Sequence, residues 1–174
     1  QKTVFLEDAV FDNSLLNKIS IYAENIEIKV SYQAKLDEPY IDHVMEIAPS
    51  TRIISWLENN IINFGSENNL VIDIHNASIT RKLFVSEVNK SGIIKKQNEY
   101  LYELNFEVLF LLYDDDAQIL ATAKTEVFRS TTSSEYISLN ERNIILDNLT
   151  LDSLKDLSEK SVELLKLHMS KFIL

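Results

Sequence analysis

Apolar and polar residues alternate most regularly between residues 100 and 129, and this pattern predicts a β-hairpin. On the first strand the even positions are all apolar, namely Tyr102, Leu104, Phe106, Val108, Phe110 and Leu112. A four-residue loop over 114–117 pairs Leu112 with Ile119, Phe110 with Ala121, Val108 with Ala123, Glu107 with Lys124, and Leu111 with Leu120. A slip of one residue would place Lys124 and Glu126 among the phenylalanines, which a half-buried sheet does not tolerate.

The turn end of this hairpin is apolar on both faces. The odd positions of the first strand begin polar and become apolar at Leu109, Leu111 and Tyr113, and Leu120 lies on the second strand. Either another segment of the chain covers these residues, or they contact a partner protein or an acyl chain. On the face of the even residues, the small residues Ala121 and Ala123 lie opposite Phe110 and Val108 and leave room for a helix.

The segments before the hairpin predict strands and one helix. Strands are expected over 19–23, 26–33 and 70–85, the last with a bulge between His75 and Ile79. A helix is expected over 49–64, followed by Gly65 as a left-handed C-cap and carrying Trp56 as a core anchor. The lysine-rich residues 87–98 are expected to form a loop, and residues 129–134 a polar link.

A long helix is predicted at the C-terminal end of the sequence. Ser138 and Glu141 have the spacing of a capping box, in which each side chain bonds the other residue's backbone N–H. Leucines at spacings near 3.5 continue the helix to Phe172. A helix of that length is on the order of 50 Å long. We expect it to exceed the sheet, so that it breaks near residues 148–150 or projects.

Together these elements predict an α+β fold. The architecture is an antiparallel β-sheet of about four to five strands, with two helices packed on one face. Residues 1–17 are unpatterned and are expected to form a flexible N-terminal arm or tether, while residues 18–174 form a single domain.

Composition narrows the classes of function. The net charge of −10 argues against binding nucleic acid or adsorbing to anionic lipid. The sequence has no cysteine and two glycines, which excludes disulfides, thiolate sites and glycine-rich phosphate loops. Its longest uncharged apolar run, residues 108–113, is far short of the ~20 residues that a membrane-spanning helix needs. The sequence opens with Gln1 and not Met, so we expect a removed leader, and a leader that ended in an acylated cysteine would make the mature protein a lipoprotein.

Candidate chemical groups are few. His43 lies beside Asp42, a pair that can act as a base, but no nucleophile is near it in the sequence, so a structural hydrogen bond is the preferred interpretation. His75 is interpreted as a strand-surface residue and residues 114–116 as a solvated acidic turn. His168 falls on or beside the apolar stripe of the last helix and is interpreted as a core or boundary histidine. No histidines have ligand spacing. The sequence therefore predicts no enzyme, no cofactor and no metal site.

Several short motifs carry a family resemblance over residues 26–174. They are Tyr32, Pro39-Tyr-Ile-Asp-His43, Pro49, Trp56, Gly65, Asp73-Ile-His-Asn-Ala-Ser78, Arg129-Ser-Thr-Thr and Ser138-Leu-Asn-Glu-Arg142. Their order and spacing resemble a group of uncharacterised alphaproteobacterial envelope lipoproteins. The layout is similar to the lipopolysaccharide-assembly lipoprotein of the outer membrane and to auxiliary lipoproteins of lipid-transport ABC systems. Those are sheet-plus-two-helix domains without catalytic residues.

The resemblance implies a periplasmic, membrane-anchored accessory protein that docks on an envelope protein in lipid or lipopolysaccharide transport. It would touch the membrane only through its lipid anchor. The candidate contacts are Leu109, Leu111, Leu120 and Tyr113. The alternative is a small-ligand or lipid-binding domain, with an apolar cavity between sheet and helices beside Ala121 and Ala123.

Overall fold

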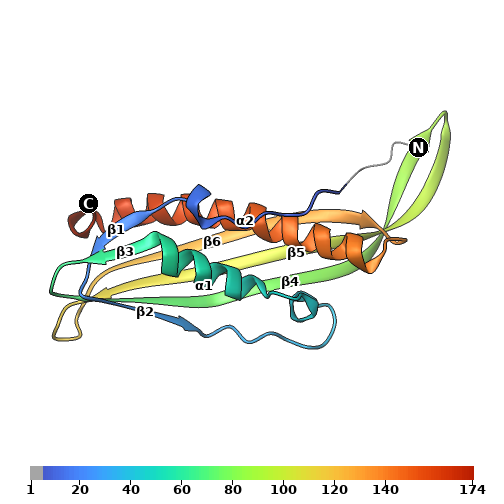
Figure 1. The fold of residues 1–174 in the computed structure, drawn as a ribbon. Coiled ribbons are helices and arrows are strands. Elements are labelled where there is room, and N and C mark those ends of the chain that lie inside the picture. Colours follow the sequence, from blue (N-terminus) through green and yellow to red (C-terminus); the bar gives the residue numbers. More distant parts are fainter. Residues whose placement is uncertain (1–5) are drawn as a thin grey trace.

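The region of regular alternation forms one inner strand and one edge strand of a four-stranded sheet that has both helices on one face (Figure 1). The structure is a computed structural model that describes residues 6–174. The strands are β1 (Ile19–Tyr22), β2 (Asn25–Val30), β3 (Ile61–Phe64), β4 (Asn69–Lys90), β5 (Ile93–Tyr113) and β6 (Ile119–Ser134). The helices are α1 (Pro49–Asn60) and α2 (Leu139–His168), with short 3-10 turns η1 (Asn13–Leu15), η2 (Asp42–Val44) and η3 (Ser170–Phe172). The predicted α+β class is confirmed.

The sheet is mixed, so the prediction of a purely antiparallel sheet was wrong. Its strand order is β2-β4-β5-β6, with β2 parallel to β4 and the other pairs antiparallel. A second, two-stranded sheet pairs β1 with β3, also in parallel. Parallel neighbours need a crossover connection, and α1 supplies it for both pairs because it lies between their partners in the sequence.

The first helix is shorter than its pattern predicts, because α1 ends at Asn60 and the chain continues as β3. The buried Asn60 amide fixes this transition by donating to the carbonyls of Asn13, Leu16 and Asn17 at 2.8, 3.1 and 3.1 Å. Gly65 is left-handed as predicted, with φ of +94°, but it follows a strand and not a helix.

The predicted lysine-rich loop at 87–98 was also wrong, because β4 and β5 continue through it. They are joined by a two-residue turn in which Ser91 and Gly92 both have positive φ, 56° and 79°. Paired positive φ values match the right-handed twist of the flanking strands. This hairpin leaves the body of the molecule, and Figure 1 shows it bending away at one end of the sheet. The predicted bulge in β4 is present, between Ile74 and Asn76.

The β5–β6 hairpin keeps the predicted faces, but its register differs by two residues. Phe110 pairs with Ala123 and not Ala121, Leu111 with Thr122, and Leu109 with Lys124. The loop contains five residues, 114–118. Tyr113 pairs with Ile119 and Leu112 with Ala121, so Leu120 lies unpaired in a bulge of β6. Each irregularity shifts the register by one residue, so together they restore the alternation of faces. Residues 129–134, predicted as a link, extend β6.

The core lies between the inner face of the sheet and the two helices. The six even residues of β5 from Tyr102 to Leu112 are at most 1% exposed, as the alternation predicts. The capping box is present, since Ser138 Oγ accepts from the Glu141 N–H at 3.1 Å and Glu141 Oε2 accepts from the Ser138 N–H at 2.8 Å. Helix α2 neither breaks nor overhangs: its 30 residues span about 45 Å, whereas the 21 residues of β5 span about 70 Å.

The N-terminal segment follows the helical layer. Residues 1–5 lie outside the described part. Within 6–17, Leu16 is buried, the Asn148 side chain donates to the Glu7 carbonyl at 2.8 Å, and the Arg52 guanidinium lies 3.7 Å from the Phe11 ring centroid. The flexible arm and the domain boundary at residue 18 stay predictions.

Candidate functional site

The apolar end of the outer sheet face is the first candidate site. Leu109, Leu111 and Tyr113 of β5 point to the face opposite the helices, and each is half-buried. Val71 of β4 pairs with Leu111 and is also half-buried. We call these four residues the outer apolar cluster. Over residues 6–174 both helices pack on the other face, so no helix covers these four residues (Figure 1).

Leu120 was predicted to face Leu111, and that pairing was wrong. It is the residue skipped in the β6 bulge and is 41% exposed, beside the cluster at the turn end of the hairpin. Ile119 next to it is 59% exposed and pairs with Tyr113. The turn end therefore presents several large apolar side chains to solvent. Monomeric soluble proteins rarely expose such side chains in one contiguous patch.

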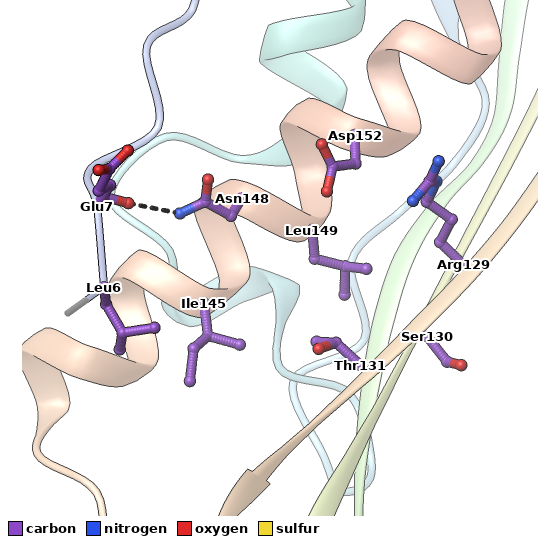
Figure 2. A pocket seen from close by; sticks show the side chains of 9 residues that line it. All are labelled: Leu6, Glu7, Arg129, Ser130, Thr131, Ile145, Asn148, Leu149 and Asp152. Atoms are coloured by element: carbon purple, nitrogen blue, oxygen red, sulfur yellow. Dashed lines mark hydrogen bonds between the residues drawn. The ribbon is translucent and has the colours of Figure 1, made fainter. Parts of the chain in front are cut away.

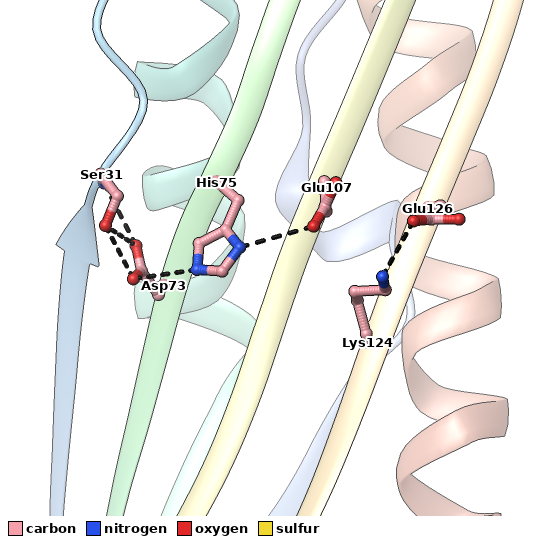
Figure 3. Close-up of polar contacts among 6 residues, drawn as sticks. All are labelled: Ser31, Asp73, His75, Glu107, Lys124 and Glu126. Atoms are coloured by element: carbon pink, nitrogen blue, oxygen red, sulfur yellow. Dashed lines mark hydrogen bonds and ion pairs between the residues drawn. The ribbon is translucent and has the colours of Figure 1, made fainter.

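A row of ionisable side chains, which we call the charged row, crosses the sheet beside Leu109 of the outer apolar cluster. Figure 3 shows the residues of this row. His75 lies between two carboxylates: its Nε2 is 3.1 Å from Asp73 Oδ2 and its Nδ1 is 3.4 Å from Glu107 Oε1. Ser31 donates through its hydroxyl to the Asp73 carboxylate at 2.7 Å. The bulge in β4 turns His75 toward the outer face, where it lies between Asp73 of β4 and Glu107 of β5. The phase slip in the sequence of β4 indicated this bulge.

The charged row continues on β6. Lys124 Nζ lies 3.1 Å from Glu126 Oε1, and this hydrogen bond, with the nearby Glu107 charge, raises the pKa of Lys124. Because Lys124 pairs with Leu109, the row crosses the sheet at the edge of the apolar residues. An apolar surface with a charged rim is the usual composition of a protein contact.

A cavity of about 540 Å³ opens between β6, α2 and the N-terminal segment (Figure 2). Its apolar lining comes from Leu6, Ile145 and Leu149. Its polar lining includes Thr131, Asp152 and Arg129, whose Nη2 lies 3.2 Å from Asp156 Oδ1. Such a mixed lining can hold a small amphipathic molecule.

The predicted position of an apolar cavity, beside Ala121 and Ala123, is occupied by packing. Ala123 is 4% exposed, and Ala121 packs against the core. Next to them, Ser161 of α2 donates to Thr125 Oγ1 at 2.9 Å, with both side chains fully buried. The small residues thus admit the helix, as the sequence indicates, and the cavity that does open lies further along β6.

Asp42 and His43 do not form a hydrogen-bonded pair that could act as a general base. The Asp42 carboxylate is buried, accepts the Tyr32 hydroxyl at 2.7 Å and accepts the Ile79 N–H at 3.3 Å. Burial and the Asp42 carboxylate raise the pKa of Tyr32. His43 is exposed. The aspartate therefore ties the 31–44 segment to β4.

The other singled-out residues have structural positions. Trp56 is fully buried and donates through Nε1 to the Asn17 carbonyl at 3.2 Å. Asp114 accepts the N–H groups of Asp116 and Gln118 at 2.9 and 2.8 Å, which shapes the acidic turn. His168 is exposed at the end of α2. Among residues 6–174, no cluster of three or more acidic or histidine ligands is placed to hold a metal ion.

Comparison with known proteins gives distant structural similarities and no match in sequence. Neither family models nor curated protein sequences match the chain. A crystal structure of a minor lipoprotein from Acinetobacter baumannii covers 82% of this chain and 90% of its own, at 12% identity and a TM-score of 0.38. A similarity at that level carries no argument about function. In the described part of the chain, neither helix has the length and apolar character needed to traverse a bilayer.

Proposed function

We propose that this protein is a non-enzymatic docking protein of the bacterial cell envelope. The observation that carries the proposal is the outer apolar cluster, Val71, Leu109, Leu111 and Tyr113, on the sheet face that has no helix over residues 6–174. At the turn, Leu120 is also partly exposed. A partner that covers the cluster removes half-exposed apolar area from water, which favours association.

The charged row supports a protein as the occupant of this surface. His75, Glu107 and Lys124 form a rim that can orient a partner through polar contacts, and the buried Asp73 carboxylate holds the His75 ring in place. Opposite charges within the rim suit a partner of matching pattern better than a bulk lipid phase. The envelope location and the link to lipid or lipopolysaccharide transport rest on the motif resemblance. A periplasmic site and an upstream lipid anchor are part of the proposal.

An affinity capture of the leader-bearing protein from solubilised membranes tests this function. We expect the wild type to retain a defined protein and the Leu109→Asp, Leu111→Asp double variant to lose it. The double variant should keep a cooperative unfolding transition, because its new carboxylates lie on the half-exposed face. An equal yield of the same protein with both forms contradicts the proposed contact.

A matched control separates the site from the net charge. Ser130→Asp combined with Thr132→Asp adds the same two charges to exposed positions of β6, further along the sheet. This control should retain the partner at the wild-type level. Loss of the partner in both double variants would indicate a general charge effect and would refute the outer apolar cluster as the contact.

A second candidate function follows from the 540 Å³ cavity beside Ile145 and Leu149. In this alternative the protein binds a small amphipathic lipid between β6 and α2. A fatty acid should then raise the melting temperature of the wild type, and Ile145→Trp, which fills the cavity, should abolish the increase. An unchanged melting temperature in the wild type argues against this candidate.

A further inference from the structure

The projecting end of the β4–β5 hairpin has a composition unlike the rest of the chain. We define the basic hairpin as residues 82–98, the part in which β4 and β5 pair only with each other. It contains four of the 17 Lys and Arg residues and one of the 27 Asp and Glu residues. Its formal charge is therefore +3, which leaves −13 on the remainder of the chain.

The basic hairpin also exposes large apolar side chains. Leu83, Val85, Ile93 and Ile94 are 52, 58, 61 and 64% exposed, and no residue of the hairpin is buried. Ile93 pairs with Lys90 and Ile94 with Asn89, so the two isoleucines lie on opposite faces directly after the turn. A two-stranded ribbon has no core of its own in which to bury them.

From this arrangement we propose that the basic hairpin inserts its tip into the surface of an anionic phospholipid bilayer. Ile93 and Ile94 would enter the boundary between headgroups and acyl chains. Lys90, Lys95 and Lys96 would contact the lipid phosphates. Charge complementarity favours this occupant, because the tip is cationic and apolar and would be attracted to anionic lipid. The rest of the chain is acidic and would be repelled by it.

The distribution over both faces favours a membrane over a protein groove. Apolar side chains lie on each face of the ribbon, and lysines do as well, since Lys95 pairs with Val88 and Lys96 with Glu87. A protein partner usually covers one face of a strand pair, whereas a lipid surface surrounds an inserted tip. The net charge of the whole chain led to the opposite expectation, because that sum hides the separation of charge along the fold.

The proposed membrane contact does not depend on the docking function. Along β5, Lys95 and Leu111 are 16 residues apart, which corresponds to about 50 Å. The hairpin and the outer apolar cluster therefore lie at opposite ends of the sheet, where separate variants can test them (Figure 1).

Sedimentation with lipid vesicles tests the proposal on the full chain. We expect binding to vesicles of equal phosphatidylcholine and phosphatidylglycerol, little binding to pure phosphatidylcholine, and weakening by salt. Each lysine near an anionic surface changes the partition about fivefold, so Lys90→Gln, Lys95→Gln and Lys96→Gln together should lower it about 100-fold. The matched control is Lys155→Gln, Lys166→Gln and Lys171→Gln, at exposed positions of the helical layer, and it should bind nearly as the wild type.

Insertion is measured separately from adsorption. The single natural tryptophan, Trp56, is buried, so Ile94→Trp adds an emission that reports the tip. We expect a blue shift of this emission with anionic vesicles, and we expect Ile93→Ser with Ile94→Ser to weaken sedimentation while Leu109→Asp with Leu111→Asp does not. Absence of binding to anionic vesicles, or equal loss in both lysine triple variants, overturns the proposal. Capture of an acidic protein by the hairpin without vesicle binding also overturns it.

Discussion

Replacing neighbouring leucines on the two faces of β5 tests whether the outer apolar cluster is open. Leu112 is fully buried in the core, whereas Leu111, one residue earlier, is half-buried on the outer face. Leu112→Ala and Leu111→Ala remove the same three carbon atoms from the same strand. The difference between the two variants therefore reports the environment of each face and not the local strand propensity.

The expected costs of the two substitutions differ about twofold. Leu112→Ala loses the full transfer free energy of its side chain and leaves a cavity, a cost of about 3–5 kcal/mol. Leu111 is more buried than exposed, so Leu111→Ala loses most of the transfer free energy, roughly 1.5–2 kcal/mol at ~0.8 kcal/mol per methylene, and leaves no enclosed cavity. For a chain of this length, 1 kcal/mol shifts the melting temperature by about 2–4 °C.

Urea denaturation followed by far-ultraviolet circular dichroism gives both free energies of unfolding. The slope against urea should be unchanged in either variant, so that the midpoint alone reports stability. A cost for Leu111→Ala equal to that of Leu112→Ala would place Leu111 in a closed core. That result would refute the open outer face on which the proposed docking rests.

Three further predictions concern stability. Gly65→Ala should lower the free energy of unfolding by about 2 kcal/mol or more, because a Cβ at φ +94° would lie 2.4 Å from Tyr22 Cε2. Gly92→Ala should cost less, because Gly92, at φ +79°, has no atom within 4 Å of an added Cβ. Thermal melts of the two variants check this difference. Ser138→Ala should cost about 1 kcal/mol by removing the α2 cap, and Ser138→Asp should restore most of it in urea titrations. Burial, together with the Glu46 and Asp8 charges and against Arg52, raises the pKa of Asp147. Its ionisation therefore destabilises the folded state as pH rises, so Asp147→Asn should melt higher than the wild type at neutral pH, and equally below about pH 3; a higher wild-type melting temperature at pH 7 would contradict this.

The sequence was most informative where one face of an element is buried. Alternation on β5 identified the inner face, since its six even residues enter the core. The capping box at Ser138 located the start of α2 because it is a local hydrogen-bond pattern. Both signals are contained in a few consecutive residues.

Register and pairing partners could not be obtained in this way. Phe110 pairs with Ala123 and not with Ala121 because of the loop length and the bulge at Leu120. Neither feature leaves a periodic signal in the sequence. Parallel pairing of β2 with β4 depends on the path of the chain through α1. The short strand β3 was absorbed into the predicted helix because Ile61 and Phe64 also fit helical spacing.

The basic hairpin escaped prediction for a related reason. Its residues are exposed on both faces, so burial imposes no alternation between residues 82 and 98. The lysines and the turn at Ser91 and Gly92 therefore resembled a loop. In the outer apolar cluster, Val71 was missed because its relation to Leu111 appears only after β4 and β5 are paired.

Site-specific photo-crosslinking in membranes tests the docking proposal most directly. A photoreactive residue at Leu111 probes the outer apolar cluster, and one at Ser130 probes the same sheet face away from it. We expect a discrete adduct with one envelope protein from position 111 and none from position 130. Equal adducts at both positions, or only lipid adducts at position 111, would contradict the proposed docking function.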